Sequence, residues 1–503
     1  MAEYLRALLV VMVIGVAYFF SVRKALLDLL PQDTFNRWRN LWFATTLILF
    51  LSHGIWIATL AIGVVLLIYR RREAHVMGLY FVLLFAAPPV PAEIPGLGII
   101  DHLWVLNHYR LLGLTLLLPT ALFLYQRSST PRLGASPVDW MVLGYVVLLS
   151  MLSFRDGSAT SGLRTILSLW IDIFLPYYVA SRSIRTLEGM KQAMTGFVIG
   201  AMLVGALAMF EVLRSWKLYS AVLGTLGVSQ WLFGGYLTRS GFLRPNAAVG
   251  NSIVLGYVQV VALGFYFYLQ AFLSRPRHRW MGLGLLVGGI VASLSRGPWV
   301  GAAVLVVVYL FIGPNPVKRL GLLGLASLVS LFVLSLLPSG QLLIDMLPIV
   351  GEIEQGNVEY RANLLTAALP VIERHLLFGS HDYLNAPELQ VMRQGEGIID
   401  VVNAYVGVAL HSGLLGLALF LGAFIGALKQ VRNAVRMTRR SDPQTAMLGR
   451  ALIATVLAIM FIIYTVSSII AIPIVYWSVL GMCVAYAGMV REQVRNPREA
   501  LSP

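Results

Sequence analysis

Long apolar stretches, separated by short charged segments, recur along nearly the whole sequence and limit what this chain can fold into. A helix that crosses a bilayer needs about 20 mainly apolar residues. Windows of that kind lie near 5–22, 41–69, 74–90, 108–126, 138–154, 163–181, 194–213, 248–273, 280–296, 298–313, 320–337, 401–428, 449–468 and 471–490. Only 12% of the residues are charged and 58% are hydrophobic, which no ordinary soluble domain matches. The sequence therefore predicts an all-α polytopic membrane protein with about 14 transmembrane helices.

The net charge of +15 is carried by short basic clusters between these windows rather than by a soluble domain. Such clusters mark cytoplasmic loops under the positive-inside rule, so the lipid bilayer is the expected partner and nucleic acid is not. The clearest clusters are Arg70–Arg72, Arg275–Arg279 and Lys429–Arg440. Alternation then places the segments 91–107, 155–162, 214–247, 338–400 and the turn near Pro473 on the external side.

The chain divides into three parts on this reading. Residues 1–337 form transmembrane helices 1–11 with the external segment 214–247, residues 338–400 form a large external loop, and residues 401–503 form the last helices and a cytoplasmic tail. The basic stretch 23–40 breaks the alternation, so the long window 41–69 is a candidate re-entrant hairpin. The first window is expected to stay as an anchor, and the single cysteine, Cys483, predicts neither disulfides nor a thiolate metal site.

The loop 338–400 is too long to be a simple connector, and loops of that length are usually functional or disordered. Apolar residues at helical spacing predict an ordered amphipathic helix on the membrane surface; they are Leu364, Leu365, Ala368, Leu369 and Ile372. The loop also holds four titratable side chains, namely Glu373, His381, Glu396 and Asp400, and we expect the chemistry to be assembled there. Its histidines and Asp382 form no recognised metal motif, so a metal site is not expected.

Arginines at the external ends of apolar windows are candidate phosphate ligands. Arg296 stands between two windows with no loop, two residues before Pro298, a residue suited to the start of a helix. Arg239 and Arg244 likewise stand before a proline, Pro245, that precedes an apolar window. Arg361 is at the start of the amphipathic stretch of the large loop. The alternatives are headgroup anchoring for the first three and pairing with a nearby glutamate for Arg361. Two acidic residues inside windows, Asp172 and Glu211, are expected to pair with Arg164 and Arg214.

Asp400 and Asn403 come at the end of the loop, where the last long window begins. With Gly407 they would share one face of a helix, so that a carboxylate and an amide point together into a cavity. A sugar hydroxyl needs a base and orienting donors, and this pair offers both. The alternative role for Asp400 is a helix N-cap.

Five short motifs, in order, resemble the O-antigen ligase and polymerase superfamily over roughly residues 160–490. They are Arg239 with the following Gly-Phe and Arg-Pro-Asn, Ser-Arg-Gly-Pro-Trp at 295–299, Tyr360-Arg361, the Phe378-Gly379 turn, and Val402-Asn403-Ala404-Tyr405 with Gly413 and Gly416. The segment Leu175 to Arg182 looks more like the exopolysaccharide polymerase branches.

The resemblance implies a GT-C-like, metal-independent inverting glycosyltransferase without a cofactor, which faces the periplasm from the bacterial inner membrane. Its donor would be an undecaprenyl-pyrophosphate-linked glycan, with the pyrophosphate held by Arg239 or Arg244 and by Arg296, and the acceptor sugar at Asn403 and Tyr405. Ligases of this family have a His-Asn pair where this chain has Val402-Asn403. That departure leaves the identity of the base open among the four candidates of the loop.

The leading hypothesis is a polymerase that joins lipid-linked repeat units into exopolysaccharide, capsule or O-antigen, with a chain-length-regulating copolymerase as a candidate partner. The close alternative is a ligase that moves finished glycan onto lipid A core or protein. A transporter or flippase would have a similar number of spans, but the two halves of this chain show no convincing internal repeat.

Overall fold

The computed structural model describes residues 2–96, 98, 101–230, 232–233, 235–239, 241–336, 356–394 and 397–495. This part of the chain is mostly helical, and nine of its helical segments are long and apolar enough to cross a membrane. They are Glu3–Leu26 (α1), Pro137–Arg155 (α7 with a final turn η2), Ala159–Ser183 (α8, η3 and α9), Leu187–Arg214 (α10), Ser252–Phe272 (α12 with η5), Pro316–Val333 (in α15, Pro316–Leu336), Ala404–Thr438 (α19), Pro443–Thr465 (α20) and Ile472–Arg495 (α21). The predicted all-α membrane class is confirmed, while the count of 14 stays a prediction.

Two shorter apolar helices, α3 (Ile55–Arg70) and α14 (Arg296–Phe311), accompany the nine, as does α13 (Pro276–Ala292). The predicted long window 41–69 contains parts of two helices, because α2 (Gln32–Leu51) ends at Leu51 and α3 begins at Ile55. The window 74–90 is also wrong as a single span. Its helix α4 (Val76–Leu84) has 9 residues, too few to cross a bilayer, and nearly all of them are buried.

Glycine explains how α4 lies so deep in the protein. A Cβ atom on Gly196 of α10 would overlap the carbonyl oxygen of Gly78 of α4. The two backbones are therefore in direct contact, as helices in membranes often are when small residues face each other. A Cβ atom on Gly78 would in turn meet the ring of Trp38 in α2. These contacts place α4 in the core between α2 and α10 rather than at the lipid surface.

The windows 108–126 and 163–181 are helical but not regular. Each contains one π-helical turn, η1 (Gly113–Leu117) between α5 (His108–Leu112) and α6 (Leu118–Gln126), and η3 (Trp170–Phe174) between α8 (Ala159–Leu169) and α9 (Leu175–Ser183). Two small antiparallel hairpins were not predicted. They are β1 (Ala92–Pro95) with β2 (His102–Leu106), and β3 (Thr238–Arg239) with β4 (Phe242–Leu243).

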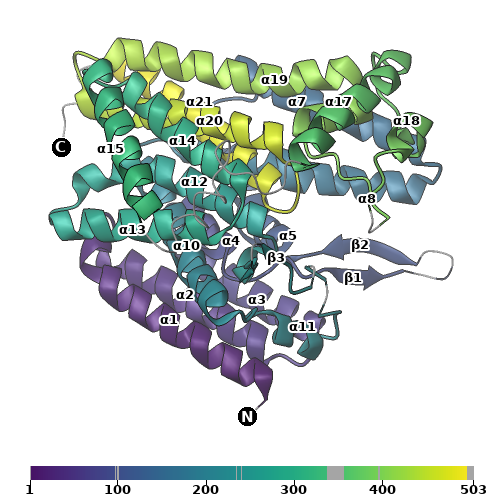
Figure 1. Cartoon of the computed structure of the whole chain (residues 1–503), viewed down its shortest axis with the longest axis horizontal. Helices are drawn as coiled ribbons and strands as arrows, with labels where there is room; N and C mark the ends of the chain where they lie inside the picture. The colour runs from purple at the N-terminus through teal and green to yellow at the C-terminus, as the bar shows by residue number, and fades with distance from the viewer. Residues whose placement is uncertain are drawn as a thin grey trace.

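The described part of the large loop, 356–394, is ordered and partly helical. Helix α17 (Gly356–Arg374) is followed by the turn η6 (Tyr383–Asn385) and by α18 (Pro387–Gln390), and α17, α18 and the β1–β2 hairpin lie toward the same end of the molecule (Figure 1). The buried face of α17 forms a small hydrophobic cluster with α18 and the start of α19; its members include Leu364, Ala368, Val371, Leu389, Val406 and Leu410. The predicted helix is confirmed, with Leu364 and Ala368 packed against protein and Leu365 and Leu369 exposed. Its position on the membrane surface stays a prediction.

Helix α19 bends where the loop packs against it. Gly413 has φ 66°, and a Cβ atom there would overlap the backbone at Leu377, while one on Gly379 would overlap the backbone at His411. Arg155, at the end of α7, donates hydrogen bonds to the carbonyl oxygens of Phe378, Gly379 and His411 at 2.9–3.1 Å. The bend and this arginine fix the loop onto the first turns of α19.

Candidate active site

A cavity of about 330 Å³ opens beside the start of α19. Its walls come from α7, the η6 turn, the segment that precedes α19, the first turns of α19, the connection from α20 to α21, and the start of α21. The polar and aromatic lining residues are Tyr145, Tyr383, Asp400, Asn403, His411, Ser467, Ser468 and Tyr476. Carboxylate, amide, hydroxyl, imidazole and aromatic groups around one space are the groups that bind and activate a sugar hydroxyl.

Asp400 projects into this cavity from an extended segment. The Ser467 hydroxyl donates a 2.6 Å hydrogen bond to Asp400 Oδ1, and the Tyr360 hydroxyl donates to the Asp400 backbone carbonyl at 3.1 Å. Because α19 begins at Ala404, the prediction that Asp400, Asn403 and Gly407 share a helix face is wrong. All three residues nevertheless line the same cavity.

Asn403, and not Asp400, is the N-cap of α19. Its side-chain oxygen accepts hydrogen bonds from the backbone N–H groups of Tyr405 and Val406, at 3.0 and 3.3 Å. This is the usual role of an asparagine that has extended backbone angles immediately before a helix. The N-cap alternative for Asp400 is therefore wrong, and its carboxylate is available for the cavity.

His411 is a cavity residue that the sequence reasoning missed. It stands four residues after Gly407 and eight after Asn403, so it continues the same side of α19 into the cavity. Its ring packs edge-on against Tyr383, with 6.5 Å between ring centroids. Following the i, i+4, i+8 spacing by one more turn would have found it.

Two of the predicted phosphate ligands lie close together at the start of α14. Arg296 is the first residue of this helix, two positions earlier than Pro298, where we had expected the helix to begin. Arg239 donates a 2.7 Å hydrogen bond from Nη1 to the carbonyl oxygen of Leu294. Leu294 has φ 48°, so a left-handed turn presents this carbonyl to Arg239 and then leads into Arg296.

Arg361 joins these two arginines from the large loop. It is exposed on α17, and its Nη2 atom donates to the carbonyl oxygen of Thr465 at 3.3 Å. Partial burial, together with the positive charges of Arg239 and Arg296, lowers the pKa of Arg361, whereas the Asp400 carboxylate raises it. Three cations and one carboxylate from four separate segments therefore lie within electrostatic range of one another.

Residues at the C-terminal end of α20 and just after it contact Arg361, the start of α14 and Asp400. Thr465 accepts the hydrogen bond from Arg361, and its hydroxyl would lie 2.7 Å from a Cβ atom on Gly297, the residue after Arg296. Ser467 follows two residues later and binds Asp400. Glycine in the Ser-Arg-Gly-Pro-Trp motif thus permits α14 to approach α20 closely.

Arg244 lies near Lys217, where its positive charge contributes to lowering the lysine pKa after the larger effect of burial. The segment that carries Arg239 and Arg244 is anchored by Glu211, which accepts hydrogen bonds from the backbone N–H groups of Leu218, Asn246 and Ala247 at 2.9–3.0 Å. Pro245 does not start a helix as expected, because α12 begins later, at Ser252, behind the N-cap Asn251.

Three other predicted residues, Glu373, His381 and Tyr405, are not among the residues that line the cavity. Glu373 is exposed on α17, and His381 is exposed with its Nε2 atom 3.8 Å from Asp382 Oδ1. The Tyr405 hydroxyl donates to the carbonyl oxygen of Met460 at 2.8 Å, between α19 and α20. Glu396 is outside the described residues. Within the described ranges, His, Cys, Asp and Glu side chains do not gather in threes that could hold a metal ion.

Comparison with known proteins agrees with this site. A family model described as O-Antigen ligase matches residues 281–421, a range that contains Arg296, Arg361, Asp400, Asn403 and His411. No curated protein matches the chain. Residues 281–421 are therefore similar to an O-antigen ligase domain, and the long apolar helices of the described part indicate a multi-pass membrane protein, which is consistent with the O-antigen ligase and polymerase superfamily.

Proposed function

We propose that this protein is a polymerase that joins undecaprenyl-pyrophosphate-linked oligosaccharide repeat units on the periplasmic face of the bacterial inner membrane. One observation carries the proposal: Arg239, Arg296 and Arg361 gather beside Asp400, and Asp400 also lines the cavity at the start of α19. A doubly charged leaving group and a hydroxyl to be deprotonated thus have adjacent sites.

The cationic side would bind the donor. The guanidinium groups of the three arginines offer forked N–H donors to pyrophosphate oxygens, and negative charge grows on those oxygens as the glycosidic C–O bond breaks. Interactions that strengthen with this charge stabilise the transition state more than the ground state. The positive charges that already lower the Arg361 pKa would be balanced by the bound diphosphate.

The cavity side would bind the acceptor. Its aromatic rings, among them Tyr145 and Tyr383, suit the apolar faces of a sugar, and Asp400 accepts the proton of the attacking hydroxyl. The hydroxyl oxygen forms the new bond to the anomeric carbon on the face opposite the leaving pyrophosphate, so the configuration inverts in one displacement. The hydrogen bond from Ser467 orients the Asp400 carboxylate. His411 is the second candidate for the base, because it lines the same cavity.

Arg296 tests the donor site. Its change to Ala is expected to lower product formation by about 10²- to 10³-fold, the cost of losing one preorganised donor to a developing anion. Purified protein would receive a single lipid-linked repeat unit, and products would be separated on a polysaccharide gel with the membrane content of the variant measured in parallel. Polymer of normal length and amount from a folded Arg296→Ala protein would refute the assigned role.

The same assay separates polymerase from ligase. A polymerase produces a ladder of products from the repeat unit alone, whereas a ligase needs a second acceptor such as lipid A core or protein. The ligase is the second candidate because the matched domain is described as O-Antigen ligase. A product that appears only when a second acceptor is added would decide for the ligase.

A further inference from the structure

A second, larger cavity lies on another face of the helix bundle, between α6 and the α8–η3–α9 segment. It has a volume of about 980 Å³ and is lined mostly by apolar side chains. Leu122 and Tyr125 of α6 are 55% and 82% exposed, so the groove opens to the surroundings of the bundle. For a membrane protein, those surroundings are lipid chains.

The groove has an aromatic wall and the length of a lipid chain. Trp170, Phe174 and Tyr178 follow one another at four-residue spacing, with ring centroids 5.0 and 5.6 Å apart. From Leu114 to Arg127 the opposite wall rises about 20 Å at 1.5 Å per residue, more than the half-thickness of a hydrocarbon core of about 30 Å. An extended acyl chain therefore fits along it.

One end of the groove is cationic. Arg127 and Arg132 line it there, together with Ser128 and Thr130. Both arginines are exposed, and neither guanidinium has an ion-pair partner within the described part of the chain. Two unpaired cations at the end of an apolar groove complement a molecule with one anionic head and apolar tails.

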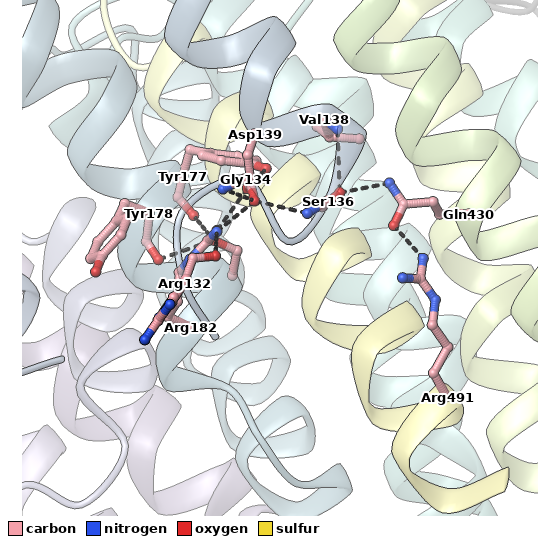
Figure 2. Close-up of polar contacts among 11 residues, drawn as sticks. Arg132, Gly134, Ser136, Val138, Asp139, Tyr177, Tyr178, Arg182, Gln430 and Arg491 are labelled. Atoms are coloured by element: carbon pink, nitrogen blue, oxygen red, sulfur yellow. Dashed lines mark hydrogen bonds and ion pairs between the residues drawn. The ribbon is translucent and has the colours of Figure 1, made fainter. Parts of the chain in front are cut away.

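The loop 127–136, which carries these arginines, is held in place by Asp139 of α7 and Arg182 of α9 (Figure 2). Asp139 accepts hydrogen bonds from the backbone N–H groups of Gly134 and Ser136, and Arg182 donates to the Arg132 carbonyl at 3.4 Å. Arg185 donates to the Ser129 carbonyl at 3.0 Å. Because the loop is ordered before any ligand arrives, little conformational entropy is lost when a headgroup binds.

We infer that this groove binds an anionic glycerophospholipid, with its phosphate between Arg127 and Arg132 and an acyl chain along the aromatic wall. The site is separate from the proposed active site, and its occupancy does not depend on the transferase reaction. With the orientation proposed above, the headgroup belongs to the cytoplasmic leaflet, because the loop 127–136 lies between two helices whose other ends are external.

Native mass spectrometry of the purified full-length protein with phosphatidylglycerol or phosphatidylcholine tests this. The wild type is expected to retain phosphatidylglycerol in preference, and Arg127→Gln/Arg132→Gln is expected to weaken its binding by about 10-fold or more. Ala121→Trp, which fills the groove and keeps both arginines, should also lose the lipid. The matched control Arg71→Gln/Arg72→Gln removes two exposed arginines elsewhere and should bind as the wild type does.

Three results would overturn the inference. They are equal retention of the two phospholipids by the wild type, undiminished phosphatidylglycerol binding by the double variant, and binding of a polyprenyl phosphate but not of phosphatidylglycerol. Each is independent of catalysis, so failure here leaves the proposed transferase activity to its own assay.

Discussion

Two clusters of arginine and aspartate lie near opposite ends of α19: Arg182 with Asp139, and Arg239, Arg296 and Arg361 with Asp400. They differ in whether their positive and negative charges are equal in number. His411 of the cavity and Gln430, which bonds to Ser136 beside Asp139, both lie on this helix and are roughly 28 Å apart at 1.5 Å per residue. At one cluster, Arg182 and Asp139 lie 2.6 Å apart with side chains only 2% and 1% exposed. At the other, three arginines share the neighbourhood of Asp400, and Arg361 is exposed.

The difference indicates what each cluster does. A buried and balanced pair holds helices α7 and α9 together, and removing one partner leaves a charge that the protein cannot solvate. An exposed cluster with more cations than anions has positive charge left over, which a bound diphosphate can neutralise. Charge balance, more than residue type, separates the structural cluster from the candidate catalytic one.

The largest effect is expected at the balanced pair. Asp139→Ala should lower stability by about 3–5 kcal/mol because it leaves Arg182 buried and unpaired. Thermal unfolding of the purified protein and its yield in the membrane measure this. The double variant Asp139→Ala/Arg182→Met should recover much of the loss, since neither charge then remains. Equal destabilisation in the single and double variants would contradict a balanced structural pair.

The cationic cluster should respond in activity and not in stability. Arg361→Ala is expected to reduce product formation by about 10²-fold or more, because a donor to the leaving group is lost. Arg361→Lys keeps the positive charge but lacks the forked guanidinium, so its product formation should lie between that of the wild type and that of Arg361→Ala. Arg374→Ala is the matched control on the same helix, where the arginine pairs with Glu388 at 2.6 Å. Loss of activity in the control, or none in Arg361→Ala, would remove the distinction between the clusters.

The smallest effect is expected at Asn403, which caps α19 and also lines the cavity. Loss of the N-cap in Asn403→Ala should cost about 1 kcal/mol, whereas Asn403→Ser keeps a capping oxygen and should restore most of it. Thermal unfolding gives the capping contribution, and the acceptor concentration needed for half-maximal rate gives the sugar contribution. If Asn403→Ser is stable and also retains full acceptor affinity, the amide has no part in acceptor binding.

Sequence alone located Arg296 because it stands between two apolar windows, where a charge is costly. Arg239 and Arg244 were located because they precede a proline before a window, and Arg361 because it opens the amphipathic stretch. The helical loop was also predictable, since its apolar spacing is a local property of residues 364–372. The grouping of Arg239, Arg296 and Arg361 had no local signal. It depends on Thr465, which accepts a hydrogen bond from Arg361, and on Ser467, which donates one to Asp400, and both are distant in sequence from these partners.

Partners of buried charges were the weakest predictions for the same reason. Asp172 pairs with Arg110 at 2.9 Å and not with Arg164, and Glu211 binds backbone N–H groups rather than Arg214. Proximity in sequence suggested the wrong arginines, because tertiary packing brings α5 to η3 across 62 residues. The π-helical turns within the windows, at η1 and η3, were not predicted either, because hydropathy does not distinguish them from regular α-helix.

The short stretch from Thr465 to Ser467 touches both halves of the proposed reaction: it contacts Arg361 and Gly297 on the donor side and Asp400 on the acceptor side. A tilt of α20 would therefore move the proposed diphosphate site and the Asp400 carboxylate together. The distance between the diphosphate site and the Asp400 carboxylate would therefore stay constant when the helix bundle fluctuates.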